Sequence, residues 1–200
     1  MSRIAVDVVL LPDEVMTDRV IIANRELVER FGRKIVLDIE RCLPHISLAM
    51  GCIDERDIGA IEKVLGEIAA RTSLGQLSIS SIFTSTSSTG EKVSVFVVEK
   101  VLPLQKLHEI VMSKLSRFFS YNVTEKMLYS DEDIAETTLD WIRDYQEKAS
   151  FENFQPHITI GYGEVTIEER FPIVFRASQI ALCHLGNHCT CRKILAGIDL

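Results

Sequence analysis

Two short segments of the chain repeat one pattern of chemically active residues. HISL begins at His45 and HITI begins at His157, and a proline precedes each histidine. A pair of imidazoles can remove one proton and deliver another during a single displacement, because imidazole titrates near neutral pH. Hydroxyl groups donate hydrogen bonds to oxyanions. The pattern therefore predicts acid–base chemistry at a phosphate, with His45 and His157 as catalytic residues and Ser47 and Thr159 as phosphate-binding residues.

Strand alternation tells us which side chains of the two motifs act together. Side chains point to opposite faces of a strand in turn, so the histidine and the hydroxyl residue of each motif share one face and the apolar residues share the other. The third position of the first face is small in both motifs, Ala49 in one and Gly161 in the other. We expect these small residues to leave room for a ligand above the sheet.

The elements that must position the motifs also repeat. Each half of the sequence has a buried strand, an amphipathic helix and a strand that begins Pro-His-Ile, and the buried strand of the second half is also the second strand of an expected hairpin. The expected elements are a strand over 3–11, a helix ending near Phe31, a strand over 42–51, a helix from Asp54 to before Gly75, a hairpin over 76–84 and 91–99, a helix from Pro103 to Phe118 and a strand over 156–163.

This order predicts one α+β domain over residues 1–200 with two pseudo-symmetric lobes. Each lobe is an antiparallel sheet backed by helices, and the two motif strands face each other across a central cleft. We place the lobes at about 1–90 and about 91–200. An acidic insertion at about 120–150 is predicted to form a helix over the site, as a lid, and the tail over 171–200 is predicted to complete the second sheet.

Composition narrows the partners and the compartment. The chain has 200 residues, 46% of them hydrophobic, and a formal net charge of −7. No apolar run is long enough to span a membrane, and Asp7 interrupts the first apolar stretch, so we expect a cytoplasmic protein that does not bind membranes. The negative charge argues against binding to long duplex nucleic acid. Five cysteines are few and odd in number, which favours reduced thiols over a disulfide framework.

The segments PHISLAMG and PHITIGYG resemble the signature of the two-histidine (2H) phosphoesterase superfamily, which includes the 2′-5′ RNA ligase-like proteins. The resemblance covers nearly the whole chain and implies the bilobal fold. It also implies chemistry without a metal or cofactor on 2′,3′-cyclic phosphates or 2′-5′ phosphodiester bonds, with RNA termini or small cyclic nucleotides as substrates. For hydrolysis it makes His157 the base and His45 the acid, and this polarity reverses for ligation. The sequence does not predict the oligomeric state.

The chain departs from this family at one position. Many relatives carry a basic residue soon after the second motif, whereas Tyr162 stands there in this chain and Met50 stands at the equivalent place in the first motif. Arg41 or Lys34 is the expected source of positive charge. We therefore expect Tyr162 and Arg41 to contact the substrate. A non-catalytic RNA-end or nucleotide-binding module with the same cleft is the alternative function.

Three other features have a purely structural interpretation as well as a functional one. His108 lies on an amphipathic helix and is expected at the surface, and Phe151 and Phe154 either stack on a base or belong to the core. A cluster of cysteine and histidine residues near the C-terminus has metal-ligand types, but its spacing fits no standard zinc site, so buried thiols are expected and a metal-binding regulatory protein is the alternative. That cluster consists of Cys183, His184, His188, Cys189 and Cys191.

Overall fold

The computed structural model describes residues 2–86, 90–130, 133–166 and 169–200. Its strands are β1 (Arg3–Pro12), β2 (Ile46–Asp54), β3 (Leu77–Thr86), β4 (Lys92–Val98), β5 (His157–Tyr162), β6 (Ile173–Phe175), β7 (Ala177–Leu185) and β8 (Cys191–Asp199). Its α-helices are α1 (Glu14–Phe31), α2 (Ile58–Ala69), α3 (Leu102–Leu115) and α4 (Glu136–Lys148). Four single-turn 3₁₀-helices connect them: η1 (Glu55–Asp57), η2 (Glu125–Met127), η3 (Phe151–Asn153) and η4 (Asn187–Cys189).

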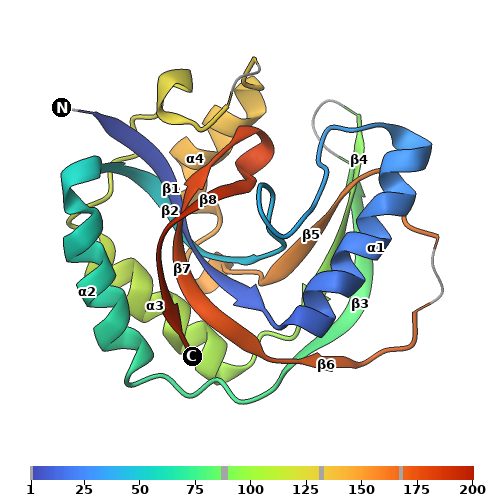
Figure 1. Cartoon of the computed structure of the whole chain (residues 1–200), viewed down its shortest axis with the longest axis horizontal. Helices are drawn as coiled ribbons and strands as arrows, with labels where there is room; N and C mark the ends of the chain where they lie inside the picture. The colour runs from blue at the N-terminus through green and yellow to red at the C-terminus, as the bar shows by residue number, and fades with distance from the viewer. Residues whose placement is uncertain (1, 87–89, 131–132, 167–168) are drawn as a thin grey trace.

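The described strands form two four-stranded antiparallel sheets, in the orders β2-β1-β7-β8 and β5-β4-β3-β6 (Figure 1). The two motif strands, β2 and β5, are therefore edge strands, and they contact each other where the sheets meet. The predicted α+β class with two antiparallel sheets is confirmed. An edge position leaves one side of each motif strand without a strand neighbour.

The helices and the hairpin follow the sequence patterns that predicted them. Residues of the expected stripe in α2, Ile61, Leu65 and Ile68, are buried. Asp54 accepts a hydrogen bond from the backbone amide of Arg56, so it caps η1, which leads directly into α2. The strands β3 and β4 pair as the expected antiparallel hairpin.

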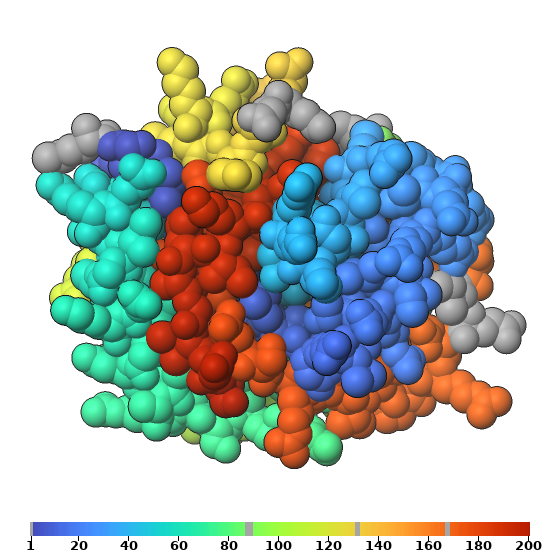
Figure 2. All heavy atoms as spheres, in the orientation of Figure 1, coloured from blue at the N-terminus to red at the C-terminus, as the bar shows by residue number. Residues whose placement is uncertain are grey.

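The prediction that the tail over 171–200 completes the second sheet is wrong for most of its length. Only the short strand β6 joins the second sheet, by pairing with β3, whereas β7 pairs with β1 and β8 pairs with β7 in the first sheet. On the face shown in Figure 2, the end of the chain lies between α2 on one side and α1 with the segment after it on the other. The sheets also divide the chain differently from lobes with a boundary near residue 90, because β3 belongs to the same sheet as β4 and β5. Strand partners depend on long-range packing, which a pattern read along the chain does not contain.

Each motif strand is covered by a helix from the other half of the chain. The helix α1 follows β1 of the first sheet but packs against β5, and α3 follows β4 of the second sheet but packs against β2 (Figure 1). The two halves are thus interlocked through their helices. A change in either helix acts on the motif of the opposite sheet.

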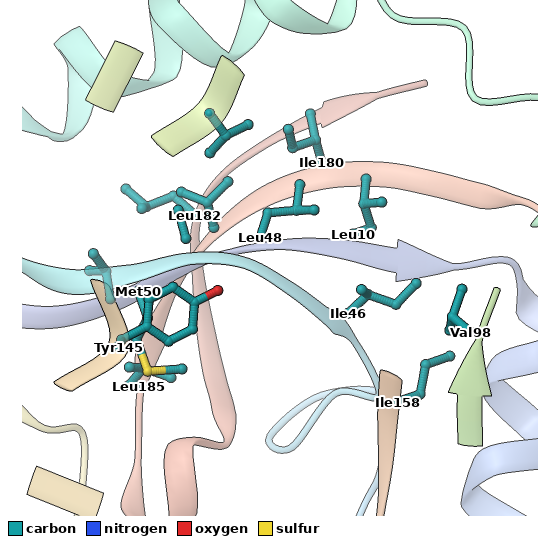
Figure 3. Packing of buried hydrophobic residues seen from close by; sticks show 14 of the residues in the cluster. Leu10, Ile46, Leu48, Met50, Val98, Tyr145, Ile158, Ile180, Leu182 and Leu185 are labelled. Carbon is teal, nitrogen blue, oxygen red and sulfur yellow. The ribbon is translucent and has the colours of Figure 1, made fainter. Parts of the chain in front are cut away.

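The first sheet is buried on both faces at the level of the motif. Leu10, Leu48 and Leu182 lie on one side of it, and Met50 and Tyr145 lie on the other (Figure 3). Tyr145 comes from α4, which is the helix predicted in the insertion and packs against β2 and η4. The insertion therefore supplies the second covering layer of this sheet beside the motif strand, and its role as a lid stays a prediction.

Two cysteines differ from the expectation of reduced thiols. Cys183 on β7 and Cys191 at the start of β8 form a disulfide, because these neighbouring antiparallel strands bring the two sulfur atoms together. Cys42, Cys52 and Cys189 are free. None of the described helices combines the length and the apolarity that a membrane span requires.

Candidate active site

Both motif histidines are held in the same way. The Nδ1 atom of His45 lies 2.8 Å from the carbonyl oxygen of Leu43, and Nδ1 of His157 lies 2.8 Å from the carbonyl oxygen of Gln155. In each case the acceptor is the residue before the proline, and a following proline favours extended backbone at that residue. A carbonyl can only accept, so each ring carries its proton on Nδ1 and keeps a lone pair on Nε2.

The surroundings of the two rings lower the pKa of both histidines. The pKa of His45 is lowered to about 4, chiefly by burial, against the hydrogen bond to Leu43 that raises it and with a smaller lowering by the charge of His157. Burial also lowers the pKa of His157. The His45 side chain is still 13% exposed, so a ligand can reach it. Both imidazoles are therefore neutral near pH 7 in the free protein, and a bound anion would favour protonation of either.

Ser47 contacts a carboxyl group that the sequence analysis did not assign to the site. Its Oγ lies 2.5 Å from Oδ2 of Asp7, and the same Oδ2 lies 3.9 Å from Nε2 of His45. Asp7 is fully buried in β1. Asp7 interrupts an apolar strand in the sequence, and a charged residue inside such a strand is itself a signal of a functional site, because burying a charge is costly.

Thr159 has the corresponding place in the second motif without such a partner. It pairs with Val95 of β4, as Ser47 pairs with Val9 of β1. Its side chain forms no hydrogen bond with any residue that the structure describes. Thr159 is therefore free to bind a ligand, whereas Ser47 is already engaged by Asp7.

A β-bulge interrupts both motif strands at the same place. Leu48 is the extra residue in β2, because Ser47 pairs with Val9 and Ala49 pairs with Val8. Likewise, Ile160 is the extra residue in β5. A bulge reverses the alternation of faces beyond it and changes the direction of the side chains beside it.

The bulges overturn the expected role of Ala49 and Gly161. Both residues lie past the extra residue and hence on the face opposite to the hydroxyl residue of their motif. Ala49 is buried in the core, and a Cβ atom on Gly161 would meet Nδ2 of Asn24 in α1 at 2.9 Å. Their small size serves the packing of helices on the sheets and leaves no room for a ligand.

A buried polar side chain binds the carbonyl group of each bulge residue. Nδ1 of His108 in α3 lies 2.7 Å from the oxygen of Leu48, and Nδ2 of Asn24 in α1 donates to the oxygen of Ile160 at 2.7 Å. Because each helix belongs to the other half of the chain, the motifs are held reciprocally. These two residues were missed, since nothing in the sequence shows that a bulge needs a hydrogen-bond donor there.

The prediction that His108 lies at the surface was wrong. His108 is fully buried, and its Nε2 accepts a hydrogen bond from the amide of Phe151 at 2.7 Å. Its ring stacks on the buried ring of Phe154, with centroids 4.0 Å apart. His108 therefore connects the first motif with the segment that leads into the second, and Phe154 belongs to the core.

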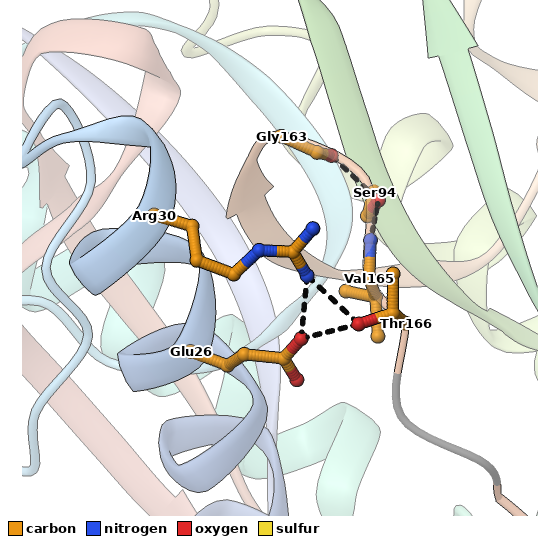
Figure 4. Close-up of polar contacts among 6 residues, drawn as sticks. All are labelled: Glu26, Arg30, Ser94, Gly163, Val165 and Thr166. Atoms are coloured by element: carbon orange, nitrogen blue, oxygen red, sulfur yellow. Dashed lines mark hydrogen bonds and ion pairs between the residues drawn. The ribbon is translucent and has the colours of Figure 1, made fainter.

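Hydrogen bonds with β4 and with α1 hold the segment that follows β5 (Figure 4). Buried Ser94 in β4 donates a hydrogen bond to the carbonyl oxygen of Gly163 at 2.7 Å. Glu26 and Arg30 in α1 both bind the hydroxyl group of Thr166 at 2.7 Å. These contacts fix the end of the strand that carries Tyr162.

Of the two predicted substrate contacts, Tyr162 lies beside Lys34 and His188. The Nζ atom of Lys34 lies 5.0 Å from the centre of the Tyr162 ring, and the phenol oxygen lies 3.1 Å from Nδ1 of His188. Lys34 also forms an ion pair with Glu91. Arg41 has an exposed side chain, and its backbone amide donates a hydrogen bond to Asp38.

A second cation, Arg192, was missed by the sequence analysis. It lines a hollow of about 360 Å³ together with Lys34, Tyr129 and His184. Arg192 stands in the tail between a cysteine and a lysine, where no motif distinguishes it from a surface charge. The fold brings it to the same hollow as Lys34, although 158 positions separate the two residues.

The cysteine and histidine cluster does not converge. Cys183 and Cys191 are joined, and Nε2 of His184 lies 3.0 Å from the carbonyl oxygen of Met127. Within the described ranges, no three His, Cys, Asp or Glu side chains are grouped in a way that would hold a metal ion.

Comparisons with known proteins agree with the architecture. No family model matches the chain, and no curated protein is similar to it in sequence. Among solved structures, TT0787 of Thermus thermophilus superposes with a TM-score of 0.59 at 14% identity, covering 98% of each chain. E. coli LigT complexed with ATP has a TM-score of 0.53 at 16% identity, covering 100% of this chain and 99% of LigT. A crystal structure of a phosphoesterase has a TM-score of 0.50 at 15% identity with the same coverage. LigT has also been observed with 3′-AMP.

These likenesses extend over the full chain while the identities stay low, so they bear on architecture. The chain shares with them its overall architecture, which here consists of two antiparallel sheets covered by helices. The chain therefore has the fold of TT0787 and of LigT.

Proposed function

We propose that this chain is a phosphoesterase that needs no metal and acts on 2′,3′-cyclic phosphates or 2′-5′ phosphodiester bonds of RNA ends or nucleotides. The observation that carries the proposal is the matched pair of histidines. Each is held through Nδ1 by the carbonyl two residues before it, which leaves Nε2 free for proton transfer. The likeness to LigT, which is observed with ATP and with 3′-AMP, supports a small nucleotide ligand.

The two imidazoles have complementary tasks in this reaction. For hydrolysis of a cyclic phosphate, neutral His157 removes a proton from water through Nε2, and the resulting oxygen attacks phosphorus. Protonated His45 then gives its Nε2 proton to the ribose oxygen that leaves. For ligation, a terminal hydroxyl group of a second nucleotide attacks the cyclic phosphate in place of water, and the two imidazoles exchange roles: one takes the hydroxyl proton and the other protonates the ribose oxygen that leaves.

Proton supply follows from the charge of the substrate. Both imidazoles have lowered pKa values in the free protein, so neither carries a proton at Nε2 near neutral pH. A phosphate placed between them favours the charged form of the acid, because opposite charges stabilise each other at short range. Binding of the substrate therefore also prepares the acid.

The hydroxyl groups and one aromatic residue complete the proposed site. Ser47 and Thr159 donate hydrogen bonds to the non-bridging oxygens, where negative charge accumulates. Tyr162 contacts the substrate with its ring, which Lys34 approaches from one side. Arg41, exposed beside the first motif, is the remaining predicted contact.

The test measures opening of a 2′,3′-cyclic mononucleotide and cleavage of a 2′-5′ linked dinucleotide by the purified chain in the presence of a chelator. His45→Ala and His157→Ala are each expected to lower kcat by about 10²- to 10⁴-fold, which is the usual contribution of general acid–base catalysis. His184→Asn serves as the matched control, because His184 binds a backbone carbonyl outside the two motifs.

Either of two results would contradict the proposal. One is full activity in a variant that lacks one motif histidine, with its fold verified by circular dichroism. The other is loss of activity on chelation, which restores when a divalent metal is added back.

The alternative of a binding module without turnover is favoured by one observation. Tyr162 stands where many relatives of the resembled family carry a basic residue, so less positive charge faces the phosphate. Binding of the cyclic nucleotide in calorimetry, with no product after prolonged incubation, would support this alternative.

A further inference from the structure

Asp7 is a buried carboxyl group directly beneath the first motif. It lies in β1 between β2 and β7, and no part of it is exposed to solvent. Its Oδ2 is 2.5 Å from the Ser47 hydroxyl oxygen, and its Oδ1 has no hydrogen-bond partner with good geometry among the described residues. An ionised carboxylate in such a place would be costly unless a cation faced it.

The described groups around Asp7 supply no positive charge at neutral pH. His45, just before β2, has its Nε2 3.9 Å from the carboxyl, but burial lowers its pKa to about 4. Tyr145 from α4 and Cys189 from η4 also interact with Asp7, and burial followed by the charge of Asp7 raises the pKa of both. All three groups are therefore neutral near pH 7.

The charged side chains described on the remaining elements around β1, which include α1, do not shift the pKa of Asp7. Opposite Asp7, β2 contributes Met50 and β7 contributes Cys183, which is held in the disulfide. The helix η2 also contacts β1, but its charged residues, Glu125 and Lys126, are exposed. Burial accordingly raises the pKa of Asp7 to about 8, against hydrogen bonds with the Ser47 hydroxyl and with the backbone amide of Ala49, which lower it.

The protonation of Asp7 decides what the Ser47 hydroxyl can do. A protonated carboxyl donates its hydrogen to Ser47 Oγ, and the hydroxyl hydrogen is then free to point at a ligand. An ionised carboxylate can only accept, so it captures that hydrogen, and its charge also repels an anion nearby.

We propose that Asp7 is a positioning residue that holds a proton and thereby directs the Ser47 hydroxyl group toward a tetrahedral oxyanion at the first motif. This inference rests on the proposed function, because it deepens the binding of phosphate assigned there to Ser47. The site accepts the anion well while Asp7 is neutral and loses a hydrogen bond to it when Asp7 ionises.

The second motif provides an internal contrast. Asp7 pairs with Met50, and the equivalent pair in the other sheet is Val93 with Tyr162. Valine cannot titrate, so no titrating group occupies the equivalent place beside Thr159 among the residues that the structure describes. The pH dependence is thus a property of the first motif alone.

The experiment measures binding of inorganic sulfate to the whole chain by calorimetry between about pH 6 and 9, because sulfate keeps its charge over this range. Affinity is expected to fall above about pH 8 and to approach a tenfold loss for each pH unit. In Asp7→Asn the affinity is expected to be independent of pH, because the amide donates to Ser47 at every pH. In Thr159→Val the affinity is lower throughout, but the slope with pH is that of the unaltered chain.

A second measurement follows the ¹³C resonance of the Asp7 carboxyl group and does not depend on ligand binding or on any variant. A midpoint near 8 supports the proposal, and a midpoint near the ordinary value of about 4 overturns it. A slope of sulfate affinity that persists in Asp7→Asn also overturns it, as does failure of the unaltered chain to bind sulfate. If cyclic nucleotides are hydrolysed while these results are negative, only the role of Asp7 is lost and the proposed function stands.

Discussion

The strand pair β1–β2 and the strand pair β4–β5 have the same construction around different chemistry. In both, Nδ1 of a histidine faces the carbonyl two residues before it, a bulge follows the hydroxyl residue, and a helix from the other half binds the bulge carbonyl. They differ beneath the hydroxyl residue, where one has Asp7 and the other has Val93.

This comparison separates two requirements of the site. The orientation of the imidazoles needs the same backbone geometry twice, and the shared features provide it. The titratable groups beside the imidazoles need no such symmetry, and the two halves differ in these groups. We infer that the two histidines of this acid–base pair are oriented in the same way and differ in the groups next to their rings.

Removing one imidazole at a time would sharpen the comparison most. The unaltered chain should show a bell-shaped dependence of kcat/KM on pH, with one limb for each histidine. His157→Ala should lose about 10²- to 10⁴-fold in kcat and the limb of the base, and His45→Ala should lose the limb of the acid. Steady-state kinetics across pH checks this, and identical profiles in the two variants would show that the halves are not differentiated.

Replacing Asp7 with asparagine should change stability in a direction set by its pKa. Because that pKa is raised from 3.8 to about 8, the folded state holds an extra proton in this interval, and the stability contributed by the group is lost as pH rises. The free energy of unfolding of Asp7→Asn should therefore rise relative to that of the unaltered chain, by up to about 1.4 kcal/mol per pH unit between about pH 4 and 8. Urea unfolding at several pH values checks this.

The control for this prediction is Val93→Asn, at the equivalent place in the second sheet. It should shift stability by an amount that does not vary with pH, since neither residue titrates. A flat difference for Asp7→Asn as well would contradict the raised pKa.

Variants of the residues that bind the two bulge carbonyls test whether the two motifs are stabilised to the same extent. His108→Leu and Asn24→Leu should each destabilise the fold by about 1–3 kcal/mol, the cost of leaving a buried polar group unpaired. Each should also lower kcat through the motif of the opposite sheet. Unfolding curves and kinetics check this, and an effect confined to one variant would break the equivalence.

Gly161 tests the packing of α1 on the second motif. Gly161→Ala should destabilise by about 1–3 kcal/mol, because its φ of 151° is unfavourable for alanine and the added Cβ would meet Asn24 at 2.9 Å. Ala49→Gly, at the equivalent place in β2, should cost less, about 1 kcal/mol. Equal costs at the two positions would argue against the close approach of α1.

The smallest expected effect concerns the residues beyond the bulges. Tyr162→Phe removes the contact with His188 and keeps the ring beneath Lys34, so KM should rise only a few-fold, which corresponds to about 1 kcal/mol. A loss of kcat instead would place the phenol group in the chemical step.

Local patterns were informative wherever the relevant neighbours are close in sequence. The helix over 58–69 and the hairpin follow from periodicity and turn residues, and His45 and His157 stand out because each motif is contained in four residues. The tail was misassigned and His108 was misplaced, since their partners β1 and Leu48 are far away along the chain.

By itself, the sequence determined the repeated His-x-Ser/Thr motif, the α+β class and the order of helices and strands, because apolar periodicity and residue type are local properties. Only the tertiary structure decided that bulges turn Ala49 and Gly161 toward the helices, that each helix serves the opposite sheet and that Asp7 lies beneath Ser47. Those outcomes depend on which strands pair and in which register, and register is set by the packing of the whole chain.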